Sequence, residues 1–406
     1  MRVARWILGI AGAVVLLAVG AALLATLVIN PDRYRGNIEN AVRRDTGRPF
    51  ALAGHLRLTW YPWLGMRMGA ARLGNPPGIA GPDLLDWRSA ELRVRLLPLL
   101  LHHRLEIGRI RIVGADIHVH RGPRGESSWD DLIARLRPRG TASPWAITWA
   151  GLDLEQTSLE YVDERSLEQV SLTDWQLTVG PWPPAQSLSL GTSFVLRANT
   201  LGVHGSPAAA GSLQLPPDGV RMSLEVPRLQ VATAASGPVE VLAPQWSLRV
   251  ADAQLAGAID ATRDAAGALT ASGSLTAAVP SLRDLAATLG FGLPKVQDPA
   301  ALRLLSLSGK WSYRNGVLTV KPLTAKLDST TLTGWAARTA RPRPSWTFAL
   351  RADQVDFGRY LTQTKEQKPP ELPVSALQAL HAQGTLELER ARIGGTTLTD
   401  VRLQVQ

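Results

Sequence analysis

Apolar and polar residues alternate along most of the chain beyond its first thirty residues. The period of two is clear in the runs Leu105–Ile112, Ile117–His120, Leu152–Glu155, Leu172–Val179, Val317–Val320, Leu386–Glu389 and Val401–Gln406. Such alternation indicates β-strands with one apolar and one polar face. The 36 glycines and 28 prolines fall mostly between such runs, as turn residues do. The pattern therefore predicts a mainly β fold.

Apolar pairs recur seven residues apart between residues 105 and 180. Ile110 and Ile112, for example, are followed by Ile117 and Val119. An odd offset moves the second pair to the other face of the strand, unless a bulge or turn resets the alternation. Small or turn-forming residues stand between the pairs, namely Gly114-Ala115, Gln156-Thr157-Ser158 and Asp174. They permit such a reset, so the pattern supports repeated strand pairs without identifying a named repeat.

Short helices are expected to interrupt the strands. Pro31 and Asp32 suit the start of a helix over residues 31–46, and Gly47 suits its end. Ser281 is a candidate cap for a helix that Gly290 closes. Further helices are expected at residues 129–136, at residues 300–305 after Asp298-Pro299, and at residues 373–380. The polar, proline-ended stretch at residues 362–370 has the composition of a linker.

The N-terminus carries an uncharged apolar run, Trp6–Ile29. As a helix, this run is long enough to span a bilayer core of about 30 Å. Arg2 and Arg5 precede it, which places the N-terminus in the cytoplasm and the rest of the chain on the far side. A cleaved signal peptide is the alternative, but its apolar core spans only about 7–15 residues and ends at small residues. The sequence therefore predicts a retained single-pass anchor.

Composition narrows the function classes. The chain has no cysteine, which excludes disulfides, thiolate metal sites and cysteine nucleophiles. Its net charge of +10 lies within residues 1–140, where 21 basic residues face 11 acidic ones. The excess of basic residues thus belongs to one end of the chain. A nucleic-acid partner is not expected, because the chain beyond the anchor is predicted to lie on the far side of the membrane. Three tryptophans lie in this basic part of the chain and suit either a membrane interface or an ordinary core: Trp60, Trp63 and Trp87. Five arginines near them suit either contact with lipid headgroups or a solvated surface: Arg33, Arg35, Arg43, Arg44 and Arg48.

Candidate chemistry is sparse. The sequence has no nucleophile elbow, zinc-protease motif, phosphate-binding loop, Rossmann glycine set or EF-hand. Asp116, His118 and His120 share one face of a predicted strand and are candidate metal ligands, although a solvated strand face gives the same pattern. The carboxylate pairs Asp130-Asp131 and Asp163-Glu164 suit a helix start and a turn. We therefore assign no catalytic, cofactor-binding or metal-binding residue and do not expect an enzyme.

One block of sequence carries Thr46-Gly47-Arg48, Tyr61-Pro62-Trp63-Leu64-Gly65 and Asn75-Pro76-Pro77-Gly78. This block resembles the AsmA family of envelope proteins, and the similarity continues in order over nearly the whole chain. The resemblance implies a Gram-negative inner-membrane anchor and a long curved antiparallel β-sheet that forms a groove in the periplasm. It further implies phospholipid movement between inner and outer membranes and a role in outer-membrane biogenesis, with no catalytic residues.

The resemblance also suggests a division of the chain. Residues 1–30 are expected to be the cytoplasmic tip and transmembrane anchor, residues 31–361 a β-rich periplasmic domain, and residues 362–406 a linker and the start of a further β segment. Family members usually continue beyond this point, so the chain is either a fragment or a short member. An alternative role is a non-enzymatic scaffold whose sheet edges bind partners in outer-membrane protein assembly. A third, an envelope hydrolase, has no motif in its favour.

Candidate groove-lining residues lie on the alternating apolar positions. They are Ile110, Ile112, Leu152, Leu154, Leu172 and Leu177. The sequence leaves open whether this apolar face is an open groove for lipid or a core covered by the short helices, because both need the same alternation.

Overall fold

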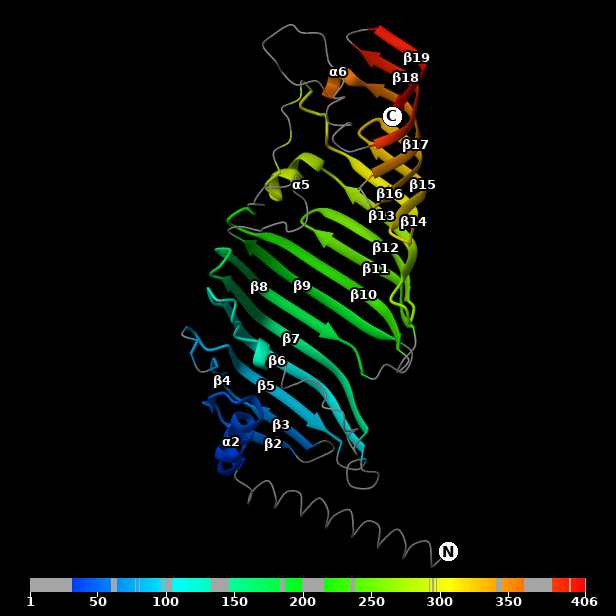
Figure 1. The fold of residues 1–406 in the computed structure, drawn as a ribbon. Helices are drawn as coiled ribbons and strands as arrows, with labels where there is room; N and C mark the ends of the chain where they lie inside the picture. Colours follow the sequence, from blue (N-terminus) through cyan, green and yellow to red (C-terminus); the bar gives the residue numbers. More distant parts are fainter. Residues whose placement is uncertain are drawn as a thin grey trace, which may run out of the picture. The chain divides into compact units, whose positions relative to one another are not determined.

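The computed structural model describes most of the chain beyond its first thirty residues (Figure 1). The described residues are 31–59, 64–76, 78–79, 81–95, 98, 104–132, 146–182, 187–198, 215–233, 238–291, 293, 296, 298–340, 345–360, 382–393 and 396–405. The predicted anchor, Trp6–Ile29, lies outside them, as do the predicted linker and the helix at residues 373–380. Within the described part of the chain, no helix has the length and apolar character needed to cross a membrane.

The chain divides into two compact units. Unit 1 comprises Met1–Ala185 with Ala198–Thr200, and unit 2 comprises Gln186–Arg197 with Leu201–Gln406. Both are built around β-sheets, so the prediction of a mainly β protein with short helices is confirmed. The predicted domain limits at residues 30 and 361 fall on residues outside the described set and stay predictions.

Among its described residues, unit 1 contains the following named helices and strands. They are η1 (Pro31–Tyr34), α2 (Arg35–Thr46), β1 (Phe50–Leu52), β2 (Leu56–Thr59), β3 (Leu64–Met68), β4 (Ala71–Leu73), β5 (Leu85–Val94), β6 (Arg104–Arg121), β7 (Ala146–Asp163) and β8 (Glu168–Val179). Strand β5 pairs with β3, β4 and β6; β1 pairs with β4, and β2 with β3. Strand β7 lies between β6 and β8.

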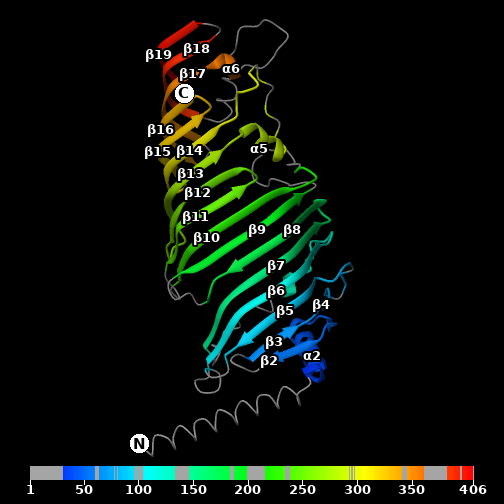
Figure 2. The ribbon, with the colours of Figure 1, turned by 180° about the vertical axis from the view of Figure 1, so that it is seen from behind.

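The described residues of unit 2 form eleven strands and two short helices. They are β9 (Leu188–Ala198), β10 (Val220–Thr233), β11 (Val239–Val250), β12 (Ala253–Arg263), β13 (Leu269–Val279), α5 (Leu282–Thr288), β14 (Leu305–Arg314), β15 (Val317–Leu327), β16 (Thr330–Thr339), β17 (Ser345–Asp356), α6 (Phe357–Tyr360), β18 (Ala382–Ile393) and β19 (Thr396–Val405). Each strand pairs with the next in sequence, and Figure 2 shows this sheet from behind.

The expectation of a wholly antiparallel sheet is wrong at two places. Strands β6 and β7 pair in parallel, and so do β17 and β18. A parallel pair needs a crossover long enough to return the chain to the same end of the sheet. The connections from Arg121 to Ala146 and from Asp356 to Ala382 have that length. The first contains helical residues at 130–132, and the second begins with α6. Both units therefore contain one such crossover.

The seven alternating runs fall on strands throughout their described residues, as predicted; only Gln406 of the last run lies outside the described set. The predicted reset of the alternation is also present, because Gly114, Gln156 and Asp174 have positive φ angles of 64°, 51° and 52°. The β7–β8 register shifts on both sides of Thr157. A residue inserted in this way keeps the apolar positions before and after it on one face of the strand.

The first predicted helix is confirmed by α2, which ends at Gly47 in the left-handed conformation (φ 73°). Its C-terminus leads into the core of unit 1, where Phe50, Leu52, Leu56, Ala71, Leu73 and Leu84 are buried. Trp87 packs against this core with its ring centroid 5.9 Å from that of Phe50, so its role is structural. Trp60 and Trp63 lie outside the described residues.

The structure contradicts both alternatives that the sequence offered for Arg48, a solvated surface position and contact with lipid headgroups. It is fully buried, and its Nη2 donates to the Ser128 carbonyl oxygen at 2.6 Å and pairs with the Asp131 carboxylate. Burying a guanidinium requires such partners to offset its lost hydration. Arg48 thus fixes the segment at residues 128–132 over the core.

Candidate functional site

The six candidate groove residues share one face of unit 1. Ile110 lies opposite Leu152 and Ile112 opposite Leu154 in the parallel β6–β7 pair. Across β7–β8, Leu154 lies opposite Leu177 and Leu159 opposite Leu172. Directly paired residues project from the same face of a sheet, and the bulge at Gln156 keeps the two halves of β7 in phase.

The other face of the same strands is charged. Arg109 pairs with Asp153 and Arg111 with Glu155, each with an N–O distance of 2.6 Å. Beyond the bulge, the Ser158 hydroxyl donates to the Asp116 carboxylate. These contacts place the polar side chains on the opposite face from the six candidates along the described length of β6 and β7.

The six candidates are half-buried, and none belongs to a buried core cluster. Trp129 and Leu132 instead pack against the buried core of unit 1, as do Leu85 and Trp87 of β5, which lie opposite Ile117 and Ala115 of β6. The short helical segment after β6 therefore covers only part of the apolar face, as far as the described residues show. Whether the six residues line a lipid groove stays a prediction.

Unit 2 carries a longer apolar face that the sequence interpretation did not single out. The paired positions across β12–β19 form two adjacent apolar rows. One row contains Leu255, Ala277, Leu307, Ala325, Leu332, Ala352, Leu388 and Val401; the other contains Gly257, Leu275, Gly309, Leu323, Gly334, Leu350, Leu386 and Leu403. Most of these residues are half-buried.

The row between these two projects from the other face; it begins with Ala256 in β12 and is polar from β13 to β19. It contains Thr276, Ser308, Thr324, Thr333, Arg351, Glu387 and Arg402. Two of its members form ion pairs with glutamates, Arg351 with Glu389 and Arg402 with Glu387. The two faces of unit 2 therefore differ in the same way as those of β6–β8. The apolar face escaped notice because alanine and glycine occupy many of its positions, which weakens the period-two signal.

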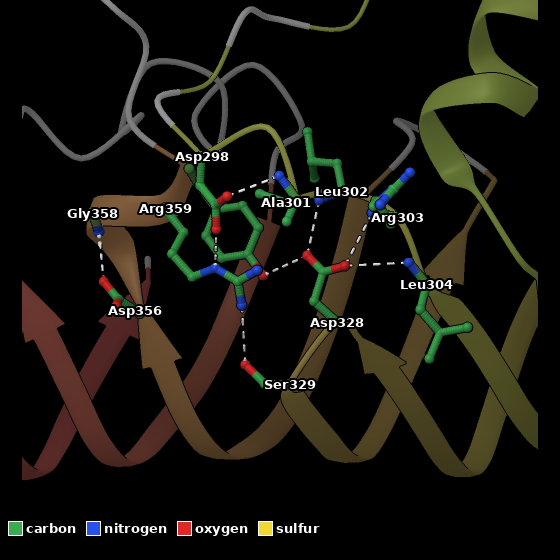
Figure 3. A network of polar contacts seen from close by, with 12 residues as sticks. Asp298, Ala301, Leu302, Arg303, Leu304, Asp328, Ser329, Asp356, Gly358 and Arg359 are labelled. Atoms are coloured by element: carbon green, nitrogen blue, oxygen red, sulfur yellow. Dashed lines mark hydrogen bonds and ion pairs between the residues drawn. The ribbon is translucent and has the colours of Figure 1, made fainter.

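A polar network joins three segments at one end of these strands (Figure 3). Asp328, in the β15–β16 turn, accepts the backbone N–H groups of Leu302, Arg303 and Leu304 at 2.8, 3.0 and 3.2 Å. It also accepts the Tyr360 hydroxyl of α6 at 3.1 Å. The loop before β14 and the helix after β17 are thereby attached to one turn.

The same network explains why the helix expected at residues 300–305 does not form. Asp298 accepts the Ala300 N–H at 2.8 Å and makes one turn, as a helix cap would. The next N–H groups donate to Asp328 instead of to helical carbonyls, and Leu302 has a φ of 59°. Arg359 of α6 completes the attachment with a 2.7 Å ion pair to Asp298. Helix α5, in contrast, is capped by Ser281 as predicted.

Hydrogen bonding sets the ionisation of Asp328. Partial burial raises the pKa of its carboxyl, but the N–H groups of Arg303 and Leu302 and the Tyr360 hydroxyl outweigh this, so the pKa lies below its ordinary value. A depressed pKa in the folded state means that the charged carboxylate stabilises the fold at neutral pH. This contribution is lost as the pH falls below about 4, through the folded-state pKa.

We therefore expect Asp328→Asn to lower the free energy of unfolding by about 2 kcal/mol at pH 7. The difference from the wild type should shrink in acid, where the wild type loses the same contribution. Urea unfolding at several pH values measures this, with Asp252→Asn in the exposed β11–β12 turn as the control. A difference that stays constant from pH 7 to pH 3 would contradict the role given to the carboxylate.

The candidate metal ligands do not converge. The Asp116 carboxylate accepts a bond from Ser158, the Nδ1 of His118 lies 3.0 Å from the Asp83 carbonyl oxygen, and the Nε2 of His120 lies 3.1 Å from the Glu164 carboxylate. Within the described residues, no group of three or more His, Asp or Glu side chains is arranged to hold a metal ion. Of the carboxylate pairs, Asp131 binds Arg48 and Asp163 caps the β7–β8 turn, accepting the Arg165 N–H at 2.8 Å.

Comparison with protein families agrees with the resemblance. The family model described as "AsmA family" matches residues 1–405. The chain belongs to the AsmA family. Neither a curated protein nor a solved structure gave a significant match. AsmA proteins are generally associated with the cell envelope.

The AsmA signature has a physical basis in unit 1. Thr46 donates its hydroxyl to the Val42 carbonyl oxygen at 2.6 Å, Gly47 ends α2, and Arg48 holds Ser128 and Asp131. The three residues therefore join the helix to the segment that covers one end of the apolar face. The aromatic-Pro-Trp step of the signature lies outside the described residues.

Proposed function

We propose that this AsmA protein is anchored in the inner membrane by its N-terminal segment and conducts phospholipid toward the outer membrane, with its bulk in the periplasm. The observation that carries the proposal is the apolar face of each unit, most of whose residues are only half-buried over several strands. An ordinary core face would be covered by a second layer, because uncovered apolar patches of this extent are rare on soluble proteins.

Acyl chains suit such a face physically. Each CH₂ group moved out of water onto an apolar surface contributes about 0.8 kcal/mol. A whole chain is therefore held firmly, yet such contacts are non-directional and do not fix one position. The paired rows across β12–β19 offer equivalent leucine and alanine positions on successive strands. A lipid that leaves one strand meets a similar surface on the next.

A second candidate role is a scaffold that binds partners at a sheet edge. Among the described residues, β19 pairs with β18 alone, so its other edge has unpaired backbone groups. Such an edge accepts an added strand from another protein. This role needs no bound lipid, which separates it from the first.

Lipid transfer between vesicles tests the proposal. The full-length chain is reconstituted into donor vesicles that contain a fluorescent phospholipid, and its appearance in acceptor vesicles is followed. We expect faster transfer than from protein-free vesicles. A folded chain that leaves the transfer rate unchanged would reject conduction and favour the scaffold.

A further inference from the structure

Arg338 is a charged residue on the apolar face of unit 2. In the sheet it lies between Leu318 of β15 and Trp346 of β17. The next row on the same face consists of Val320, Ala336 and Phe348. Arg338 is exposed and lies one residue before the end of β16. It therefore borders the apolar face at the strand ends opposite the Asp328 turn.

Two arginines on the polar face of the same sheet have glutamate partners, and Arg338 does not among the described residues. Arg351 and Arg402, on the polar face of β17 and β19, pair with Glu389 and Glu387. Within the described residues, no carboxylate forms an ion pair with Arg338. An unpaired guanidinium presents several N–H donors in a planar arrangement that matches the oxygens of a phosphate group.

An aromatic ring lies beside the Arg338 guanidinium. The guanidinium carbon of Arg338 lies 6.0 Å from the ring centroid of Trp346, which is 37% exposed. Stacking on the indole orients the guanidinium and leaves its N–H edge free. Indole rings also favour the boundary between apolar and aqueous surroundings. The pair therefore marks a border between an apolar surface and water.

We propose that Arg338 and Trp346 bind the phosphate of a phospholipid whose acyl chain extends along the apolar face toward Leu332. Charge complementarity identifies the occupant, because an apolar molecule gains nothing from an unpaired arginine. The length also fits. Arg338 lies six positions after Leu332, which is about 20 Å along the strand. One acyl chain spans about 15 Å, half of a bilayer core, so the strand is long enough to hold it.

This inference rests on the proposed function, since it assigns an orientation to lipid on the same face. The test measures binding of fluorescent phosphatidylglycerol and of fluorescent diacylglycerol, which lacks the phosphate. The full-length chain is kept soluble with an amphipathic polymer instead of detergent. Arg338→Gln is compared with Arg351→Gln, which removes an arginine from the opposite face of the neighbouring strand.

Loss of one charge-assisted contact should weaken phosphatidylglycerol binding by Arg338→Gln about tenfold. Diacylglycerol binding should not change, and Arg351→Gln should match the wild type for both lipids. Equal phosphatidylglycerol affinity in Arg338→Gln and wild type would overturn the headgroup site while leaving acyl binding intact. Displacement of the lipid by an equal concentration of inorganic phosphate would also overturn it, because the site would then not be specific for lipid. Absence of binding of either lipid to the wild type would overturn the proposed function itself.

Discussion

Gly273→Val is expected to lower the free energy of unfolding by about 3 kcal/mol or more. Gly273 lies within β13, opposite Ile259 of β12 and Trp311 of β14. A Cβ atom at this position would lie 1.9 Å from the Ala258 carbonyl oxygen and 3.0 Å from the Trp311 ring. The Ala258 oxygen belongs to the backbone of the neighbouring strand, so the clash with the valine side chain can be relieved only if the strands move apart.

The adjacent strand repeats this arrangement. A Cβ atom on Gly257 of β12 would lie 2.0 Å from the Ser274 carbonyl oxygen and 3.1 Å from the ring of Trp246. In both places a tryptophan lies over the glycine directly opposite it. Glycine is thus required where strands approach closely and an aromatic ring fills the space above.

Urea unfolding followed by tryptophan fluorescence measures the loss. Gly191→Val is the matched control, because Gly191 lies in strand β9 of the same unit with nothing within 4 Å of its Cβ position. The control should be neutral or slightly stabilising, since valine favours strands. Similar stability for Gly273→Val and Gly191→Val would show that the strands are not so closely spaced.

The double substitution Leu323→Asp with Leu350→Asp is expected to reduce bound phospholipid at least tenfold while the chain stays folded. Both leucines belong to one apolar row and flank Gly334. They are half-buried, so their replacement should cost no more than about 2 kcal/mol of stability. Two carboxylates on this row would have to lose water when acyl chains approach. Lipid extracted from the purified variant and wild type provides the measurement.

A matched control places the same charges on the opposite face. Thr324 and Thr347 are exposed, and Thr324→Asp with Thr347→Asp should leave lipid content unchanged. If the apolar-face variant instead unfolds while the control stays folded, the leucines are core residues and the face is covered. If both variants retain wild-type lipid, acyl chains do not bind there.

Local patterns predicted much of the fold. Period-two runs located the strands, and Gly114, Gln156 and Asp174 marked the bulges because residues with small or turn-forming side chains accept positive φ. The ends of α2 and the cap of α5 followed from Gly47 and Ser281. Each of these features depends on a few neighbouring residues, which is the information that a single sequence contains.

Features that depend on distant partners were missed. Asp298-Pro299 has the local signature of a helix start, but Asp328, from a later turn, takes the N–H groups that the helix would use. Arg48 looks like a surface residue until Ser128 and Asp131 are placed beside it. The parallel pairing of β6 with β7 and of β17 with β18 was also missed. The alternation of apolar and polar residues locates a strand but does not show the direction in which it runs. That no carboxylate of the described residues pairs with Arg338 is visible only once the two faces are assigned.

Site-specific photo-crosslinking in living cells tests the central claim most directly. A photoreactive phenylalanine analogue replaces Leu154 or Leu323 on the apolar faces, or the exposed Thr178 or Thr324 on the polar faces, in the full-length chain. Cells grown with labelled phosphate are irradiated, and the purified chain is examined for attached phospholipid. The account predicts labelled adducts at the two leucine positions and none at the two threonine positions. Equal labelling of both faces, or no labelling at either leucine, would contradict lipid binding on the apolar faces.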